Sequence, residues 1–167
     1  MSDYESFLQH GGLTEKPLKE LSHKDQVRFA LFCANQVQEH WCKEPICVKA
    51  IELVELWLED KATTIECYEH AMSMNNIINR LHDMRDKGCD TEERYYRSLL
   101  VVDYAIYGAG SAANGGLWSN NAKIASNASY YAFTTTTDAA LIHAQIAYYN
   151  ELRYIDENFQ RIVLEGE

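Results

Sequence analysis

The sequence predicts an all-α fold, a single-domain bundle of about six helices in which neighbours are mostly antiparallel. Three observations indicate this class. The two prolines, Pro17 and Pro45, both lie early in the chain. Apolar residues recur three and four positions apart, and helix-capping signals precede several of these stretches. At 167 residues, with 47% hydrophobic and 24% charged residues, the chain can bury a core without disulfides or metals.

Two helices are expected in the first third of the domain. Ser22 and Asp25 have the spacing of a capping box, with aspartate in place of glutamate, and open a helix that runs to about residue 42. Its buried face is predicted to comprise Val27, Ala30, Leu31, Ala34, Val37 and Trp41. Pro45 suits the first turn of the second helix. The buried face of that helix is predicted to comprise Cys47, Ala50, Ile51, Val54, Trp57 and Leu58.

A third and a fourth helix follow. Thr63 and Glu66 form a capping box ahead of an inner face made of Cys67, Ala71, Met74, Ile78 and Leu81. Gly88 is placed to end this helix in a left-handed conformation. Asp90 or Thr91 then caps the fourth helix, which contains the apolar run from Leu99 to Val102.

The last third of the chain is rich in alanine, serine, asparagine and tyrosine. After a loop at 113–116, a small-residue face made of Ala122, Ala125, Ala128 and Ala132 predicts a fifth helix. The threonines at 134–137 are expected to break it, with a threonine capping the final helix. The predicted inner side of that helix is Ala140, His143 or Ala144, Ala147, Leu152 and Ile155. Residues 1–16 are expected to be a loosely held arm from which Tyr4, Phe7 and Leu8 can dock, and residues 17–167 form the domain.

Charge and cysteine content narrow the classes of partner. The formal net charge of −10 disfavours nucleic acid and anionic membrane surfaces, and favours a basic protein partner. The five cysteines form an odd set without a C-x-x-C pair, and no secretory leader precedes Tyr4. We therefore expect a cytoplasmic protein with reduced thiols, and place Cys33, Cys47 and Cys67 in the core.

No catalytic, cofactor or metal site is predicted. A di-iron centre needs two Glu-x-x-His pairs on helices, whereas only Glu20 and His23 have this spacing, and they straddle a helix start. His82 with Asp86, and His70 with the nearby glutamates, are interpreted as intrahelical pairs on a solvated face. His143 lies among alanines and is expected to be a core histidine.

An acidic stripe on the second helix is the predicted partner surface. Glu52, Glu55 and Glu59 follow one another at helical spacing, and Asp60 extends the row. Two accounts are open. Lys49, Lys61 or another helix can neutralise the stripe within the molecule, or the stripe can dock lysine and arginine residues of a partner.

Two parts of the sequence resemble a known family. One is the segment from Leu18 to Ala34 with the later Lys49–Glu52 and Trp57–Leu58. The other is the alanine- and tyrosine-rich tract that ends in Asn150–Arg153 and Asn158–Arg161. Together they are similar to an alanine-rich, all-helical group of immunity proteins from bacterial polymorphic toxin (toxin–antitoxin) systems. This resemblance implies a non-enzymatic protein that binds and neutralises a cognate toxin, and it assigns no functional residue.

Three alternatives stay open. The chain can be a phage-encoded counter-defence inhibitor of a host protein complex. It can be a small-ligand binder or enzyme with a pocket between helices, using His82, His143 or the tyrosines Tyr95, Tyr104 and Tyr107. It can also be a homo-oligomeric scaffold that packs through alanines such as Ala128 and Ala132.

Overall fold

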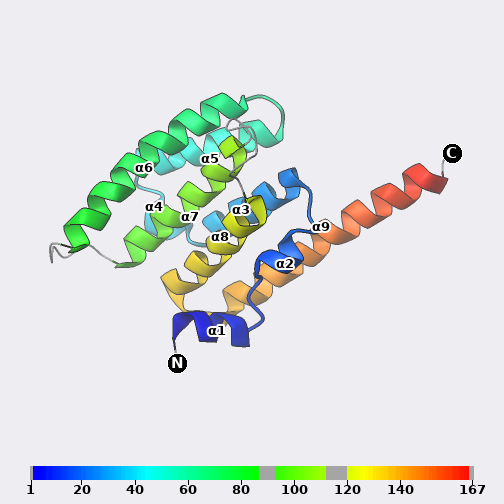
Figure 1. Ribbon diagram of the computed structural model, residues 1–167, viewed down its shortest axis with the longest axis horizontal. Coiled ribbons are helices and arrows are strands. Elements are labelled where there is room, and N and C mark those ends of the chain that lie inside the picture. Colours follow the sequence, from blue (N-terminus) through cyan, green and yellow to red (C-terminus); the bar gives the residue numbers. More distant parts are fainter. Residues whose placement is uncertain (1, 87–92, 112–119, 166–167) are drawn as a thin grey trace.

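The fold is all-α, as the sequence predicts. The computed structural model describes residues 2–86, 93–111 and 120–165, and no strand occurs in those ranges. The helices are α1 (Asp3–Gln9), α2 (Glu15–Leu18), α3 (His23–Gln36), α4 (Gln38–Trp41), α5 (Pro45–Leu58), α6 (Thr64–Asp86), α7 (Glu93–Gly110), α8 (Asn121–Thr136) and α9 (Ala139–Glu165). Figure 1 shows α7 in the middle of the bundle and α9 extending past the other helices. The described helices exceed the expected six because α1, α2 and α4 are short additions.

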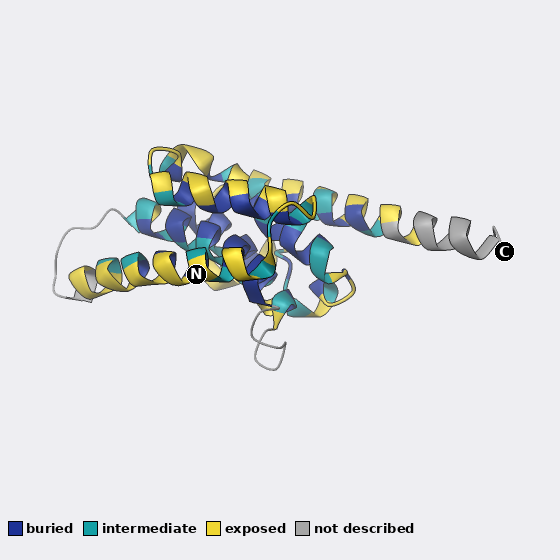
Figure 2. Ribbon diagram, turned by 90° about the horizontal axis from the view of Figure 1, so that it is seen from above, coloured by how far each residue is buried: buried dark blue, intermediate teal, exposed yellow. Residues whose placement is uncertain are grey.

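Helix α7 is the centre of the packing. It contacts α3, α4, α5, α6 and α8, and it buries Leu99, Val101, Val102, Ala105, Ile106 and Ala109. Helices α6 and α7 run antiparallel, as do α7 and α8 (Figure 1). Burial is concentrated where these helices face one another, whereas the outer face of the bundle is exposed (Figure 2).

The predicted helix starts are confirmed at three positions. The Ser22 side chain accepts a hydrogen bond from the Asp25 amide at 3.2 Å. Thr63 and Glu66 form a reciprocal capping box, in which each side chain accepts from the other residue's amide at 3.1 Å. Pro45 is the first residue of α5. These contacts satisfy amide groups that have no partner in the first turn of a helix.

The first predicted helix ends earlier than expected. It stops at Gln36, Val37 leaves the helical conformation, and the short α4 follows. The Trp41 indole NH donates to the Ala34 carbonyl at 2.8 Å, so a side chain takes up a carbonyl at the end of α3. The buried tryptophan thus holds the break between the two helices in place.

The predicted inner faces of three helices are confirmed, except that Leu58 and Leu81 are half-buried at the edge of the core. Cys47, Ala50, Ile51, Val54 and Trp57 of α5 are buried, as are Cys67, Ala71, Met74 and Ile78 of α6 and the four predicted alanines of α8. Cys33 is buried as well, and burial raises the pKa of the Cys47 thiol to about 12 and that of the Cys67 thiol to about 11. These thiols are therefore protonated core groups, as expected.

The predicted inner side of α9 is wrong. Ala140, His143, Ala144, Ala147 and Ile155 are exposed, and only Leu152 of that set is buried. The buried side instead carries Ile142, Gln145, Tyr149 and Leu152. Alanine and histidine tolerate exposure, and the sequence pattern gave no reason to place a glutamine inside.

Gln145 is buried because a hydrogen-bond network satisfies it. Its amide NH₂ donates to the Gln36 side chain at 2.9 Å, and its oxygen accepts from the Ser129 hydroxyl. Gln36 in turn donates to the Leu141 carbonyl at 3.1 Å. The network ties α3, α8 and α9 together, and a buried polar group that is satisfied in this way carries little desolvation penalty.

The threonine cap of α9 is also a wrong prediction. Thr134 and Thr135 lie inside α8 and are buried, with their hydroxyls donating to the Tyr131 carbonyl. Thr137 ends α8 in a left-handed conformation, with φ 56°. Asp138 caps α9 instead, accepting from the Ala140 amide at 2.9 Å.

The N-terminal segment is held against the bundle, which differs from the expected loose arm. Phe7 is 1% exposed and packs with Phe133, Ile142 and the Tyr130 ring. Of the three residues expected to dock, Phe7 is inserted while Tyr4 and Leu8 stay largely exposed. Gly88, the Asp90 or Thr91 cap and the loop at 113–116 lie outside the described residues.

A close backbone contact joins α6 to α7. A Cβ atom built on Gly110 would lie 2.6 Å from the Tyr68 nitrogen and 2.7 Å from its Cα. Such distances do not occur in folded proteins, and backbone atoms cannot rotate away. Gly110 is therefore required by the approach of α6, whereas a Cβ on Gly108 would meet only side-chain methyl groups, at 3.6 and 3.7 Å.

This difference gives a matched pair of variants. We expect Gly110→Ala to lower the free energy of unfolding by about 1–3 kcal/mol, because the helices must separate to admit the methyl group. Gly108→Ala should instead be neutral or stabilising by up to about 1 kcal/mol, since alanine is the better helix former. Urea unfolding followed by circular dichroism measures both changes. Equal effects at the two glycines would contradict the proposed contact.

Candidate functional site

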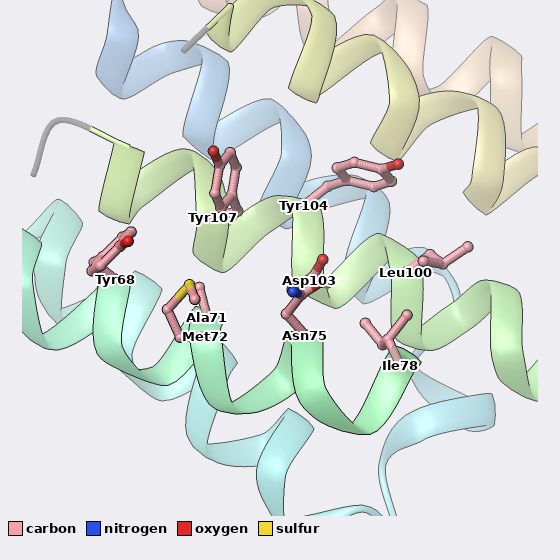
Figure 3. Close-up of a pocket in the computed structure, with 9 residues that line it drawn as sticks. All are labelled: Tyr68, Ala71, Met72, Asn75, Ile78, Leu100, Asp103, Tyr104 and Tyr107. Carbon is pink, nitrogen blue, oxygen red and sulfur yellow. The ribbon is translucent and has the colours of Figure 1, made fainter. Parts of the chain in front are cut away.

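A groove lies between α6 and α7, with a volume of about 490 Å³. One face of α6 and one face of α7 line it, because its residues recur at three- and four-residue spacing on each helix. The polar and aromatic lining residues are Tyr68, Asn75, Asp103, Tyr104 and Tyr107, and the apolar ones are Ala71, Met72, Ile78 and Leu100. Figure 3 shows Asp103 near the middle of the groove, with Tyr68 and Tyr107 on one side and Ile78 and Leu100 on the other.

Asp103 is the unusual charged group of this groove. Its side chain is half-buried on α7, and among the described residues it makes no hydrogen bond or ion pair. Burial raises the pKa of its carboxyl from the ordinary value of 3.8 to about 7. A carboxylate in this position lacks the solvation or the opposite charge that would normally stabilise it.

One tyrosine of the groove, Tyr104, is also packed against α8. Tyr104 stacks on Tyr131 of α8, with ring centroids 5.8 Å apart and an interplanar angle of 16°. Burial is the main reason that the pKa of Tyr104 is raised to about 12, and the Asn127 side chain opposes this rise. The position of the Tyr104 ring is thus fixed by α8 as well as by α7.

Two further hollows adjoin the groove and share Tyr104 with it. One is lined by residues of α1 and α8, including Tyr4, Asn127, Tyr130 and Tyr131. The other is lined by α6, α7 and α8, and includes His82, Tyr96 and Arg97. We call the surface that carries Tyr68, Tyr104, Tyr107, Tyr130 and Tyr131 the tyrosine face.

The predicted acidic stripe lies on the exposed side of α5 and its C-terminal turn. Glu52, Glu55, Glu59 and Asp60 are all exposed. Three of these carboxylates have a lysine ammonium group as partner. The Nζ atom of Lys49 lies 3.8 Å from a Glu52 oxygen, and that of Lys61 lies 2.9 Å from a Glu59 oxygen. The Nζ atom of Lys24, on α3, lies 2.9 Å from an Asp60 oxygen. Glu55 has no ion pair among the described residues. The molecule therefore neutralises most of the stripe itself.

The histidines weighed as ligands or bases are dispersed. His23 donates to the Gly108 carbonyl at 2.8 Å, and His70 lies 2.8 Å from the Ile46 carbonyl. His143 is exposed and its ring lies beside that of His10, so the expected core histidine is a surface residue. Within the described ranges, no three His, Cys, Asp or Glu side chains lie close enough to hold a metal ion.

Sequence reasoning found part of the groove and missed its acid. The sequence analysis predicts Tyr95, Tyr104 and Tyr107 as possible pocket residues, and Tyr104 and Tyr107 do line the groove. Tyr95 lies away from the groove and interacts with Glu44. Asp103 was overlooked. It follows the apolar run Leu99–Val102 directly, and a lone carboxylate in a buried helix is the signal that would have identified it.

Comparison with known proteins finds no match to a family model, a curated protein or a solved structure. The resemblance to immunity proteins therefore stays a prediction from the sequence. Among the described residues, none of the helices combines the length and the apolar composition needed to span a bilayer.

Because the pKa of Asp103 is raised, we expect the stability difference between the wild type and the variant Asp103→Asn to depend on pH. The native state binds a proton between about pH 7 and about pH 4 that the unfolded chain has released, so wild-type stability falls as pH rises through this window. Asp103→Asn removes this effect. At about pH 8 the variant should be more stable by on the order of 1–3 kcal/mol, a range kept low because the carboxyl is partly solvated.

The gain should shrink as pH falls and be lost near about pH 4. Other titratable groups that interact with Asp103 are Cys47 from α5 and Tyr104 on its own helix, and both titrate well above this window. Urea unfolding across the pH range measures the difference. A constant difference between variant and wild type would show that the Asp103 carboxyl has an ordinary pKa.

Proposed function

We propose that the chain is a non-enzymatic binding protein, an immunity-type inhibitor that neutralises a basic protein toxin by covering it. The observation that carries the proposal is the tyrosine face. Tyrosine is enriched at the centres of protein interfaces, because it offers a large ring and a polar hydroxyl at low conformational cost. Here three adjoining hollows share Tyr104.

The charge of the molecule supports a basic partner. The net charge is −10, and Asp103 adds a carboxyl without a partner in the described residues at the middle of the groove. Complementary charge accelerates association and rejects acidic partners. A phage-encoded inhibitor of a host complex would use the same chemistry, so the identity of the partner distinguishes the two biological roles.

A second candidate function is the binding of a small ligand. The observation that favours it is the groove itself, because its volume of about 490 Å³ lies within the range of roughly 300–1,000 Å³ that is typical of ligand pockets. A ligand retained by the purified protein and detected by mass spectrometry would promote this candidate.

The proposal is tested by isolating the partner and then titrating it. Affinity capture from the source cell at low and at high salt, followed by mass spectrometry, should recover a basic protein that salt releases. The purified pair is then measured by calorimetry. We expect Tyr107→Ala to weaken binding at least tenfold, as central interface tyrosines do.

Charge reversal of the stripe, with Glu52, Glu55 and Glu59 changed to lysine, separates the two candidate surfaces. A larger loss in this variant than in Tyr107→Ala would place the interface on the stripe and not on the tyrosine face. A partner bound equally well by wild type and by both variants would contradict both surfaces. An active toxin in the presence of excess protein would refute the inhibitor role.

A further inference from the structure

We propose that the groove between α6 and α7 receives a lysine or arginine side chain of the protein partner, with Asp103 as its counter-ion. The inference deepens the proposed function and rests on it for the source of the cation. The chemistry of the groove can nevertheless be tested without the partner.

The first argument is the lack of an internal partner for the Asp103 carboxyl. Among the described residues no group donates a hydrogen bond to it or forms an ion pair with it. None of the described residues that line the groove is basic. The exposed acids Glu52, Glu59 and Asp60, by contrast, each have a lysine from this chain. An incoming cation therefore meets at Asp103 a carboxyl that no basic side chain among the described lining residues already pairs.

The second argument is the aromatic lining. Tyr68 of α6 and Tyr104 and Tyr107 of α7 line the same groove as Asp103. In Figure 3 the Tyr104 ring is directed away from α6, toward α8, where it stacks on Tyr131. The faces of such rings attract ammonium and guanidinium groups, and the attraction grows when the cation is partly desolvated. A carboxylate with tyrosine rings around it favours an organic cation over a neutral or anionic group.

The third argument is the apolar part of the lining. Met72, Ile78 and Leu100 lie along the groove on either side of the acid. Lysine and arginine bury their methylene stems against apolar surface while the charged head reaches a polar group. The groove offers both kinds of surface, since its lining combines apolar side chains with the carboxyl of Asp103.

The raised pKa of Asp103 fits this assignment. Burial raises that pKa to about 7, because removing a carboxylate from water disfavours its charged form. A bound cation would supply that stabilisation and hold the carboxyl in its charged form.

Blocked amino acids test the groove directly. N-acetyl-lysine methylamide and N-acetyl-arginine methylamide are titrated into the full chain, and amide shifts are followed by two-dimensional NMR. The neutral probe is N-acetyl-norleucine methylamide, which keeps the apolar stem. We expect the cationic probes to shift the amides around Tyr68, Asp103 and Tyr107, and to bind at least tenfold more tightly than the neutral probe.

The matched variants are Asp103→Asn and Glu55→Gln, because each removes one negative charge and neither carboxyl has a partner in the described residues. Asp103→Asn should weaken the binding of the cationic probes at least tenfold, while Glu55→Gln leaves that binding unchanged.

The aromatic contact is tested at Tyr107. Tyr107→Leu should weaken binding of the cationic probes and Tyr107→Phe should not, since phenylalanine keeps the ring. Equal weakening by the two charge variants, or equal binding of the norleucine probe, would overturn the cation site.

The isolated partner tests the source of the cation. Asp103→Asn should weaken the complex at least tenfold relative to Glu55→Gln. A complex unaffected by Asp103→Asn would overturn the inference and leave the proposed binding function intact. Cationic probes that bind in the groove of a chain that binds no protein would refute the proposed function and assign the site to a free amine.

Discussion

The structure depends on the burial of α7 among five other helices. Its neighbours approach closely because its inner positions are filled largely by small or β-branched residues, among them Ala105, Ala109 and Gly110. At Gly110 the backbone of α7 lies against that of α6 at Tyr68, where no Cβ fits. Farther from Gly110 along the same two helices the side chains are larger, and Leu100 of α7 lies opposite Ile78 of α6. The groove lies between these two points, so the close contact that fixes the helix pair also fixes the groove.

Burial of α7 also accounts for the character of Asp103. A helix packed on several sides offers few positions at which a charge can reach water, and a carboxylate there is costly unless it is paired. Asp103 lies at the edge of this burial, where the groove admits solvent or a ligand. The Gln145 network shows how the same molecule treats a polar group in its interior: each hydrogen-bonding atom of the amide finds a partner on α3 or α8. The contrast between the two residues is the reason that we propose a binding role, and not a packing role, for the acid.

The sequence predicted the fold class and the inner faces of α5, α6 and α8, because apolar spacing and capping boxes are local signals. It did not predict the register of α9. The decisive residue there is Gln145, whose burial requires Gln36 and Ser129, and these are distant in the sequence. Phe7 likewise finds its pocket on α8 and α9, far along the chain. For the site, the sequence offered Tyr104 and Tyr107 but gave most weight to Glu52, Glu55 and Glu59. Helical spacing is visible in a sequence, whereas the lysines that neutralise those acids belong partly to other elements, such as Lys24 of α3.

The two acidic features differ in what they can contribute to binding. The stripe is exposed, mostly paired and screened by salt, so it can steer a basic partner but adds little affinity once the complex forms. Asp103 is a single charge, yet it is partly desolvated and its surroundings are aromatic, so one well-placed cation gains both electrostatic and ring contacts. An interface that combined the two would use the net charge for the rate of encounter and the groove for the strength and selectivity of the complex. Affinity would then follow the chemistry of one partner side chain more closely than the total charge of the partner.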